Sequence, residues 1–120
     1  MTETDKKIMV VDDDPVILRY LVNIFNHNGY PTCEAKNGVE AMEVLEAENP
    51  DLITLDIQMP EEYGPKFFRR LTKDKRYADI PVIVISGVPG RHLSIGRAVA
   101  SLSKPFDPEQ LIGIVKNTIG

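Results

Sequence analysis

The sequence is poor in the features that mark secreted and membrane proteins. Cys33 is the single cysteine, so the chain cannot form an internal disulfide, and nothing points to an oxidising compartment. No apolar run approaches the length that spans a bilayer, and the polar start MTETDKK contains no hydrophobic signal segment. These absences predict a cytoplasmic globular protein without a membrane segment.

The chain also lacks an excess of positive charge. The net charge is -4 and no block of lysine or arginine occurs, which argues against direct nucleic-acid binding. With 120 residues, 42% of them hydrophobic and 27% charged, the chain has the size and composition of one domain with a core. We expect residues 1–120 to form a single domain, with no output domain in this chain.

Short apolar runs rich in β-branched residues recur, as expected for parallel strands that are covered on both faces. They predict strands at 8–11, 52–55 and 82–85, and weaker strands at 32–35 and 101–103. Helical patterns lie between the strands, at 15–28, 38–48, 65–73, 92–100 and 107–119, of which 92–100 is short. Strand and helix alternate five times, which predicts an α/β fold with a parallel sheet and right-handed crossovers.

Two of the predicted helices carry clear start signals. Asp14 is placed to cap the first helix, with Pro15 in its first turn and Gly29 just past its end. Asp107 and Pro108 have the same relation to the last helix. Asp14 is therefore interpreted as a helix cap, although it follows two other acids.

Polar and charged side chains follow the predicted strands where each strand ends. Asp12 and Asp13 follow the first strand, Asp56 the third, Ser86 the fourth and Lys104 the fifth. Ligands of open α/β sheets bind beyond the carboxyl ends of the strands. If the first and third strands are neighbours, their acids converge and repel one another. Mg²⁺, which takes carboxylate oxygens and keeps water or phosphate in its other positions, would relieve that repulsion.

These motifs resemble the receiver domain of bacterial two-component response regulators. The resemblance runs from Lys7 to about Ile119, and it rests on VVDD, DIQMP with Gly64 after it, VIVISG and SKPF, in that order and each after a predicted strand. It implies a flavodoxin-like (βα)₅ fold with sheet order 2-1-3-4-5 and helices on both faces.

The resemblance also implies roles for the acids. Asp56 resembles the residue that attacks phosphorus and becomes an acyl phosphate. Asp13 resembles a direct Mg²⁺ ligand, Asp12 would act through water or as a second ligand, and the backbone carbonyl of Gln58 would complete the protein's share. Lys104 resembles the lysine that contacts phosphoryl oxygens, and Ser86 the hydroxyl that moves toward a new phosphoryl group.

The function implied is a signalling switch. The phosphodonor would be a sensor histidine kinase, a phosphotransfer protein or a small molecule such as acetyl phosphate, and the phosphorylated form would control a downstream effector or output domain. The chain would catalyse only its own phosphoryl transfer and dephosphorylation, so we do not expect a separate enzyme activity. Receivers often dimerise, and a homodimer is one state that the resemblance allows.

The sequence departs from the receiver pattern near its fifth strand. Receivers usually carry an aromatic residue three positions before the lysine, where this chain has Ser101. Lys104 follows Ser86 by 18 positions, whereas about 22 is more common in the family by alignment of the motifs. We therefore expect a short or atypical fourth helix, and an output route that uses the first helix or the rebuilt segment 88–100.

Three other functions remain in view. A pseudo-receiver scaffold would keep the fold without a normal phosphorylation switch, and Mg²⁺-dependent phosphorylation distinguishes it. A phosphatase of the haloacid dehalogenase type needs a second aspartate two residues after its nucleophile, where this chain has Gln58. A flavodoxin needs a phosphate-binding loop after the first strand, where this chain has acids.

Overall fold

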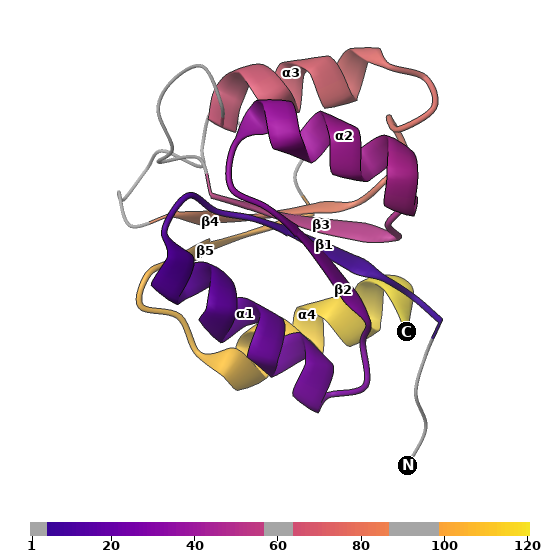
Figure 1. Cartoon of the computed structure of the whole chain (residues 1–120). Helices are drawn as coiled ribbons and strands as arrows, with labels where there is room; N and C mark the ends of the chain where they lie inside the picture. The colour runs from indigo at the N-terminus through magenta and orange to yellow at the C-terminus, as the bar shows by residue number, and fades with distance from the viewer. Residues whose placement is uncertain (1–4, 57–63, 87–98) are drawn as a thin grey trace.

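The computed structural model describes residues 5–56, 64–86 and 99–120. Five parallel strands form one sheet in the order β2-β1-β3-β4-β5, as Figure 1 shows. The strands are β1 (Ile8–Val11), β2 (Thr32–Ala35), β3 (Leu52–Asp56), β4 (Val82–Ser86) and β5 (Ala100–Ser103). The predicted flavodoxin-like sheet and its strand order are confirmed.

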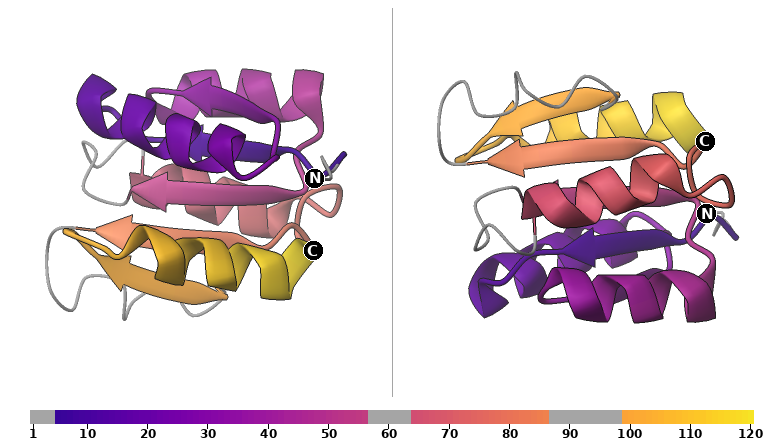
Figure 2. Two further views of the ribbon diagram at one scale, coloured as in Figure 1. Left: turned by 90° about the horizontal axis from the view of Figure 1, so that it is seen from below. Right: turned by 90° about the horizontal axis from the view of Figure 1, so that it is seen from above.

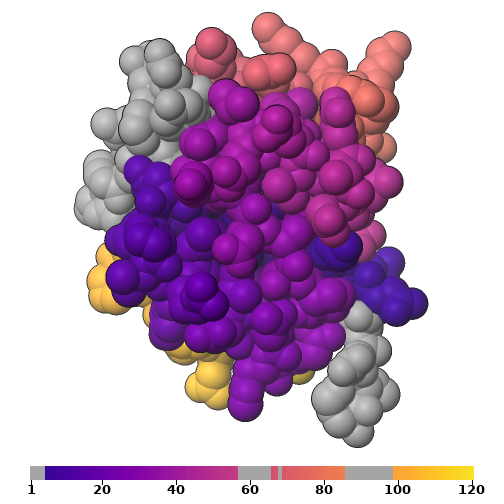
Figure 3. All heavy atoms as spheres, viewed as in Figure 1, coloured from indigo at the N-terminus to yellow at the C-terminus, as the bar shows by residue number. Residues whose placement is uncertain are grey.

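Helices cover both faces of the sheet. They are α1 (Pro15–His27), α2 (Gly38–Glu48), α3 (Gly64–Lys73) and α4 (Pro108–Ile119). Helices α1 and α4 lie on one face, and α2 and α3 lie on the other (Figures 1 and 2). The space-filling view of Figure 3 shows α1, β2 and α2 forming one continuous side of the molecule.

Of the predicted helix at 92–100, the structure describes only the last two residues. Residues 92–98 lie outside the described residues. Ala100 was predicted to end that helix, but it begins β5, where it pairs with Ile83 of β4. Strand pairing therefore overrides the weak helical pattern at this position, and the fifth strand starts one residue earlier than predicted.

The core consists of one apolar layer on each side of the sheet. Alternate strand residues point to opposite faces, so each strand contributes to both layers. One layer packs under α2 and α3 and includes Leu45, Phe67 and Leu71. The other packs under α1 and α4 and includes Phe25 and Leu111. Helices thus cover both faces of the sheet, as the nearly continuous apolar strands predict.

Local signals explain where the helices begin. The Asp14 carboxylate accepts a hydrogen bond from the Val16 amide at 2.9 Å, and the Asp107 carboxylate accepts one from the Glu109 amide at 2.9 Å. Both predicted N-caps are confirmed. In the described part of the chain, no helix is both long enough and apolar enough to cross a membrane.

Candidate functional site

The register of the central strands brings two acids to the same edge of the sheet. Val11 of β1 pairs with Leu55 of β3, so the next residues, Asp12 and Asp56, reach the carboxyl ends of the two strands together. Asp12 is 1% exposed and Asp56 is 4% exposed. Two neighbouring strands therefore hold two buried carboxylates side by side, as the sequence predicted if the strands were neighbours.

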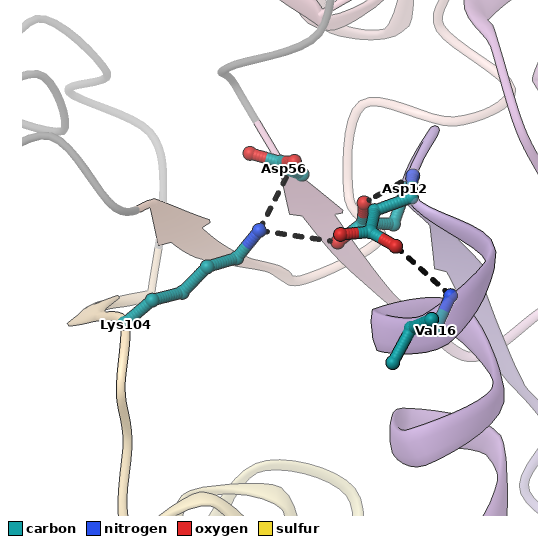
Figure 4. Close-up of polar contacts among 5 residues, drawn as sticks. Asp12, Val16, Asp56 and Lys104 are labelled. Atoms are coloured by element: carbon teal, nitrogen blue, oxygen red, sulfur yellow. Dashed lines mark hydrogen bonds and ion pairs between the residues drawn. The ribbon is translucent and has the colours of Figure 1, made fainter.

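Lys104 reaches these acids from β5, the strand at one side of the sheet. It follows β5, and its Nζ lies 3.2 Å from Asp56 Oδ2 and 3.4 Å from Asp12 Oδ2. Figure 4 shows the lysine side chain reaching between the two carboxylates. One ammonium group therefore interacts with two buried acids, and the sequence-predicted cation stands where it can offset their charge.

Burial and neighbouring charges shift the pKa values of Asp12 and Lys104. Burial raises the pKa of Asp12 to about 6 from an ordinary 3.8, and the charge of Asp56 adds to this effect, while Lys104 and the Asp14 amide oppose it. Burial alone would lower the pKa of Lys104, but the charges and hydrogen bonds of Asp12 and Asp56 outweigh it and raise that pKa. The lysine is held in its charged form, whereas ionisation of Asp12 is costly.

The three consecutive acids have different positions. The Asp12 carboxylate accepts a hydrogen bond from the Asp14 amide at 2.9 Å, and Asp14 caps α1. Asp13 is exposed, but one of its carboxylate oxygens can be grouped with one from Asp12 and one from Asp56 within 4.8 Å. The interpretation of Asp14 as a cap is supported, and Asp13 joins the cluster from the solvent side.

The donor set fits a hard divalent cation. Receiver domains generally bind Mg²⁺ at an acidic pocket, and Asp12, Asp13 and Asp56 form such a cluster here. All three offer carboxylate oxygens, and the exposed side of Asp13 leaves room for the water that Mg²⁺ retains. The cluster includes no histidine or cysteine, so its chemistry favours Mg²⁺ over zinc.

Of the other predicted site residues, the structure describes Ser86 but not Gln58. Ser86 is the last residue of β4 and pairs with Ser103 of β5, so its backbone lies at the same edge of the sheet. Gln58 lies outside the described residues. The peptide bond from Lys104 to Pro105 is cis.

The region around β5 contains no aromatic side chain at the position where receivers usually have one. Ser101 is half-buried and pairs with Val84. Because paired residues of parallel strands point to the same face, Ser101 faces the layer that contains Val84, under α2 and α3. The departure seen in the sequence is therefore located on the α2 and α3 side of the sheet.

Two features near the site were not predicted from the sequence. The buried hydroxyl of Thr54, two residues before Asp56, has no hydrogen-bond partner among the described residues. A polar residue inside an apolar strand was the available signal for it. The Tyr20 and Phe106 rings pack with their centroids 6.0 Å apart, which ties the loop after Lys104 to α1. No local pattern connects two aromatics so far apart in the sequence.

The sheet order and the acidic edge place the chain in the flavodoxin-like class. A family model described as response regulator receiver domain matches residues 8–116. The chain therefore belongs to the response regulator receiver domain family, whose members work in two-component signalling.

Curated relatives agree with this assignment. Protein Rrf1 of Nitratidesulfovibrio vulgaris is 34% identical over 113 residues, which cover 94% of this chain and 82% of that protein. The polar-differentiation response regulator DivK of Brucella anthropi is 29% identical and the match covers 96% of this chain and 97% of that protein.

Solved structures share the fold. The signal receiver domain of a signal transduction histidine kinase from Syntrophus aciditrophicus is similar with a TM-score of 0.85, 30% identity, and coverage of 95% of this chain and 89% of that chain. The chemotaxis protein CheY4 of Vibrio cholerae, at 24% identity, has a TM-score of 0.85 with 97% and 100% covered. At 24% identity, the similarity to CheY4 supports the fold alone.

Proposed function

We propose that this receiver domain is a phosphorylation-activated signalling module whose phosphoacceptor is Asp56. The observation that carries the proposal is the place of Asp56 at the end of β3. Its carboxylate is almost fully buried, lies 3.2 Å from the Lys104 ammonium and belongs to a cluster with Asp12 and Asp13. The contact with Lys104 holds this carboxylate in place, beside a cation that can attract an anionic phosphoryl group.

The chemistry is one phosphoryl transfer. A carboxylate oxygen of Asp56 attacks the phosphorus of a phosphohistidine, an oxygen–phosphorus bond forms, and the nitrogen–phosphorus bond breaks. The histidine nitrogen leaves with the electron pair and takes a proton from solvent. Lys104, already hydrogen-bonded to Asp56 Oδ2, is placed to contact an oxygen of the transferred group.

Asp12, Asp13 and Asp56 would hold Mg²⁺, with the backbone carbonyl of Gln58 as the fourth protein ligand that the family resemblance implies. When bound, Mg²⁺ neutralises charge on the acids and on the transferring phosphoryl oxygens. Lys104 pairs with Asp12 and Asp56, and Asp13 adds a third acid to the cluster, so one lysine cannot offset both their charge and that of an incoming phosphate. The cation requirement of the reaction follows from this shortage of positive charge.

The acyl phosphate would act by shifting a conformational equilibrium. A phosphoryl group adds negative charge and acceptor oxygens at the carboxyl edge, where Lys104 and the hydroxyl of Ser86 are the proposed partners. Ser101 has no ring that could move inward in response. We therefore propose that the signal leaves through α1 or through the segment 88–100, most of which lies outside the described residues.

The proposed partners follow from the family. The phosphodonor is a sensor histidine kinase or a phosphotransfer protein in the cytoplasm, and the phosphorylated receiver controls an effector or an output domain. The chain itself acts as one receiver unit and performs no chemistry beyond its own phosphorylation and dephosphorylation. The net charge of -4 and the lack of a lysine or arginine block argue against direct nucleic-acid binding by this segment.

The test is the mass of the intact protein after incubation with acetyl phosphate, with Mg²⁺ or with a chelator. The proposal predicts one phosphoryl adduct that requires Mg²⁺ and is absent from Asp56→Asn. Asp51→Asn, at the opposite edge of the sheet, is the matched control and should be phosphorylated normally. If the adduct forms equally on Asp56→Asn, Asp56 is not the acceptor.

A pseudo-receiver scaffold is the second candidate, and Ser101 is the observation that favours it. A scaffold would bind its partner without forming the adduct. Beryllofluoride, which mimics the phosphoryl group on an aspartate, separates the two functions. Chemical-shift changes around Asp56 with beryllofluoride and Mg²⁺ support the receiver switch, whereas no adduct together with no beryllofluoride response supports the scaffold.

A further inference from the structure

A groove lies between α1 and α4, on the sheet face that carries these two helices. Its volume is about 650 Å³, and its walls include Tyr20 and Ile24 of α1 and Ile112 of α4. In the left view of Figure 2 the two helices cover the same face, on either side of β3. None of the residues that line the groove belongs to the acidic cluster.

Apolar surface continues along the α1 wall of this groove. Tyr20 is 45% exposed, and Val16, one helical turn before it, is 72% exposed. Residues four apart in a helix are neighbours on one side, so these two side chains form a single exposed strip. Large apolar side chains that gather beside a groove indicate an interaction surface more strongly than scattered ones do.

Gly113, in the middle of α4, lines the groove, and no close contact with the described residues requires a glycine there. A Cβ added at this position would meet nothing within 4 Å, and its φ is not in the left-handed region. Glycine is one of the poorest residues for a helix interior, so alanine would serve the isolated chain better. A missing side chain at an exposed helix position lets a second helix approach the backbone closely.

Two opposite charges flank Gly113 on the same side of α4. Glu109 and Lys116 both line the groove, and they are seven residues apart, or about two helical turns. Both side chains are exposed, and neither forms an ion pair within the part of the chain that the structure describes. The centre between them falls at Ile112 and Gly113.

This arrangement is complementary to itself. If a second α4 crosses the first in the antiparallel direction at Gly113, Glu109 of each copy faces Lys116 of the other, because both lie equally far from the centre. A two-fold axis through that centre makes the same contact twice, as in an isologous dimer. The Tyr20 and Val16 strip of each copy then covers the neighbouring helix.

We propose that the groove between α1 and α4 is a homodimer interface, in which two α4 helices cross antiparallel at Gly113 and pair Glu109 with Lys116 of the second copy. The interface needs no residue of the phosphorylation site. It therefore stands or falls independently of the proposed phosphoryl transfer.

The test is the association of the full chain measured by sedimentation equilibrium up to millimolar concentration, with and without Mg²⁺ and beryllofluoride. Glu109→Lys and Lys116→Glu each place like charges opposite one another twice, so each should weaken dimerisation about tenfold or more. The double variant with both charges exchanged restores the pairs and should recover dimerisation. Lys73→Glu on α3 makes the same charge change as Lys116→Glu on the opposite layer, and should have little effect.

The double variant also separates the interface from helix stability. Exchanging both charges opposes the dipole of α4 at both ends, so the double variant should unfold at a lower temperature than the wild type. A loss of helix stability cannot restore dimerisation. Recovery of the dimer in a less stable protein is therefore specific to the proposed contact.

Gly113→Ala gives a second, opposite signature. Outside its own helix backbone, the new methyl group meets no described atom within 4 Å, so the variant should unfold at a higher temperature than the wild type. The same methyl group stands at the helix crossing and should weaken the dimer. A wild-type chain that stays monomeric in both states overturns the proposal, and so does a dimer that is indifferent to Gly113→Ala and to the charge exchange.

Discussion

A lysine interacts with acids at each edge of the sheet, but the acids at the two edges differ in burial. At the amino edge, Lys7 interacts with Glu48, and its backbone amide donates to Asp51. At the carboxyl edge, Lys104 interacts with Asp12 and Asp56. Glu48 is 42% exposed, whereas the two acids at the carboxyl edge are almost fully buried.

Burial determines what each edge can do. Exposed pairs are solvated by water and contribute little to stability, so the amino edge needs no further partner. Buried like charges that share one cation are costly, and Asp13 adds a third acid to them. The carboxyl edge therefore has an affinity for positive charge that the amino edge lacks, which is the property a cation-dependent phosphorylation site requires.

The largest effect is expected when the carboxyl edge loses its cation. Lys104→Met removes the partner of two buried acids, so the free energy of unfolding should fall by about 2 kcal/mol in the absence of divalent cations. Urea denaturation with a chelator measures this change. Mg²⁺ should recover part of the loss, because it binds the same acids.

The control is Arg76→Met, in the segment that leads from α3 to the amino end of β4. Arg76 pairs with Asp74 on the surface, where its side chain is 63% exposed. That variant should change stability far less than Lys104→Met. Equal losses in the two variants would show that burial does not distinguish the two sites.

A smaller effect of opposite sign is expected from Asp12→Asn. The pKa of Asp12 is raised to about 6 by burial, so the folded protein holds this proton more tightly than the unfolded chain does. The charge of Asp12 therefore lowers stability above that pKa, and the penalty disappears as the pH falls to the ordinary value of 3.8. Without divalent cations, Asp12→Asn should be about 1 kcal/mol more stable than the wild type at neutral pH.

Urea denaturation over a range of pH checks the sign. The advantage of Asp12→Asn should shrink steadily as the solution becomes more acidic. An advantage that is independent of pH would mean that the substitution acts through packing rather than through charge.

The smallest effect is expected in the reactivity of the Cys33 thiol. Burial raises the pKa of the Cys33 thiol to about 11 from an ordinary 9.0, and the charge of Glu48 adds to this. The thiolate is the form that reacts, so alkylation by iodoacetamide should be slow at neutral pH and should accelerate until the pH passes about 11. Comparison with a free cysteine peptide measures the difference, and an equal rate at neutral pH would contradict it.

Much of the fold could be predicted because each element carries its own local signal. The apolar runs of β1, β3 and β4 stop at polar residues, and Asp14 and Asp107 mark the starts of two helices. The convergence of Asp12 with Asp56 followed from the parallel order once those strands were neighbours. Ala100 was predicted wrongly because its strand character comes from pairing with β4, which no local pattern contains.

The remaining features depend on contacts between distant segments. The packing of Tyr20 on Phe106 and the position of Lys104 between two acids are set by how the elements assemble. The burial of Ile112 in the layer under α1 and α4 likewise depends on how the last helix meets the sheet. The roles of Ser86 and Gln58 stay predictions that rest on the family resemblance.

Calorimetric titration of the unphosphorylated protein with Mg²⁺ decides whether the acids at the carboxyl edge form a cation site. We expect saturable binding at one site, lost in Asp56→Asn and Asp13→Asn and unaffected by Asp51→Asn at the amino edge. Absence of saturable binding, or binding that persists unchanged in Asp56→Asn, would contradict the claim that the buried acids at the carboxyl edge form a cation site.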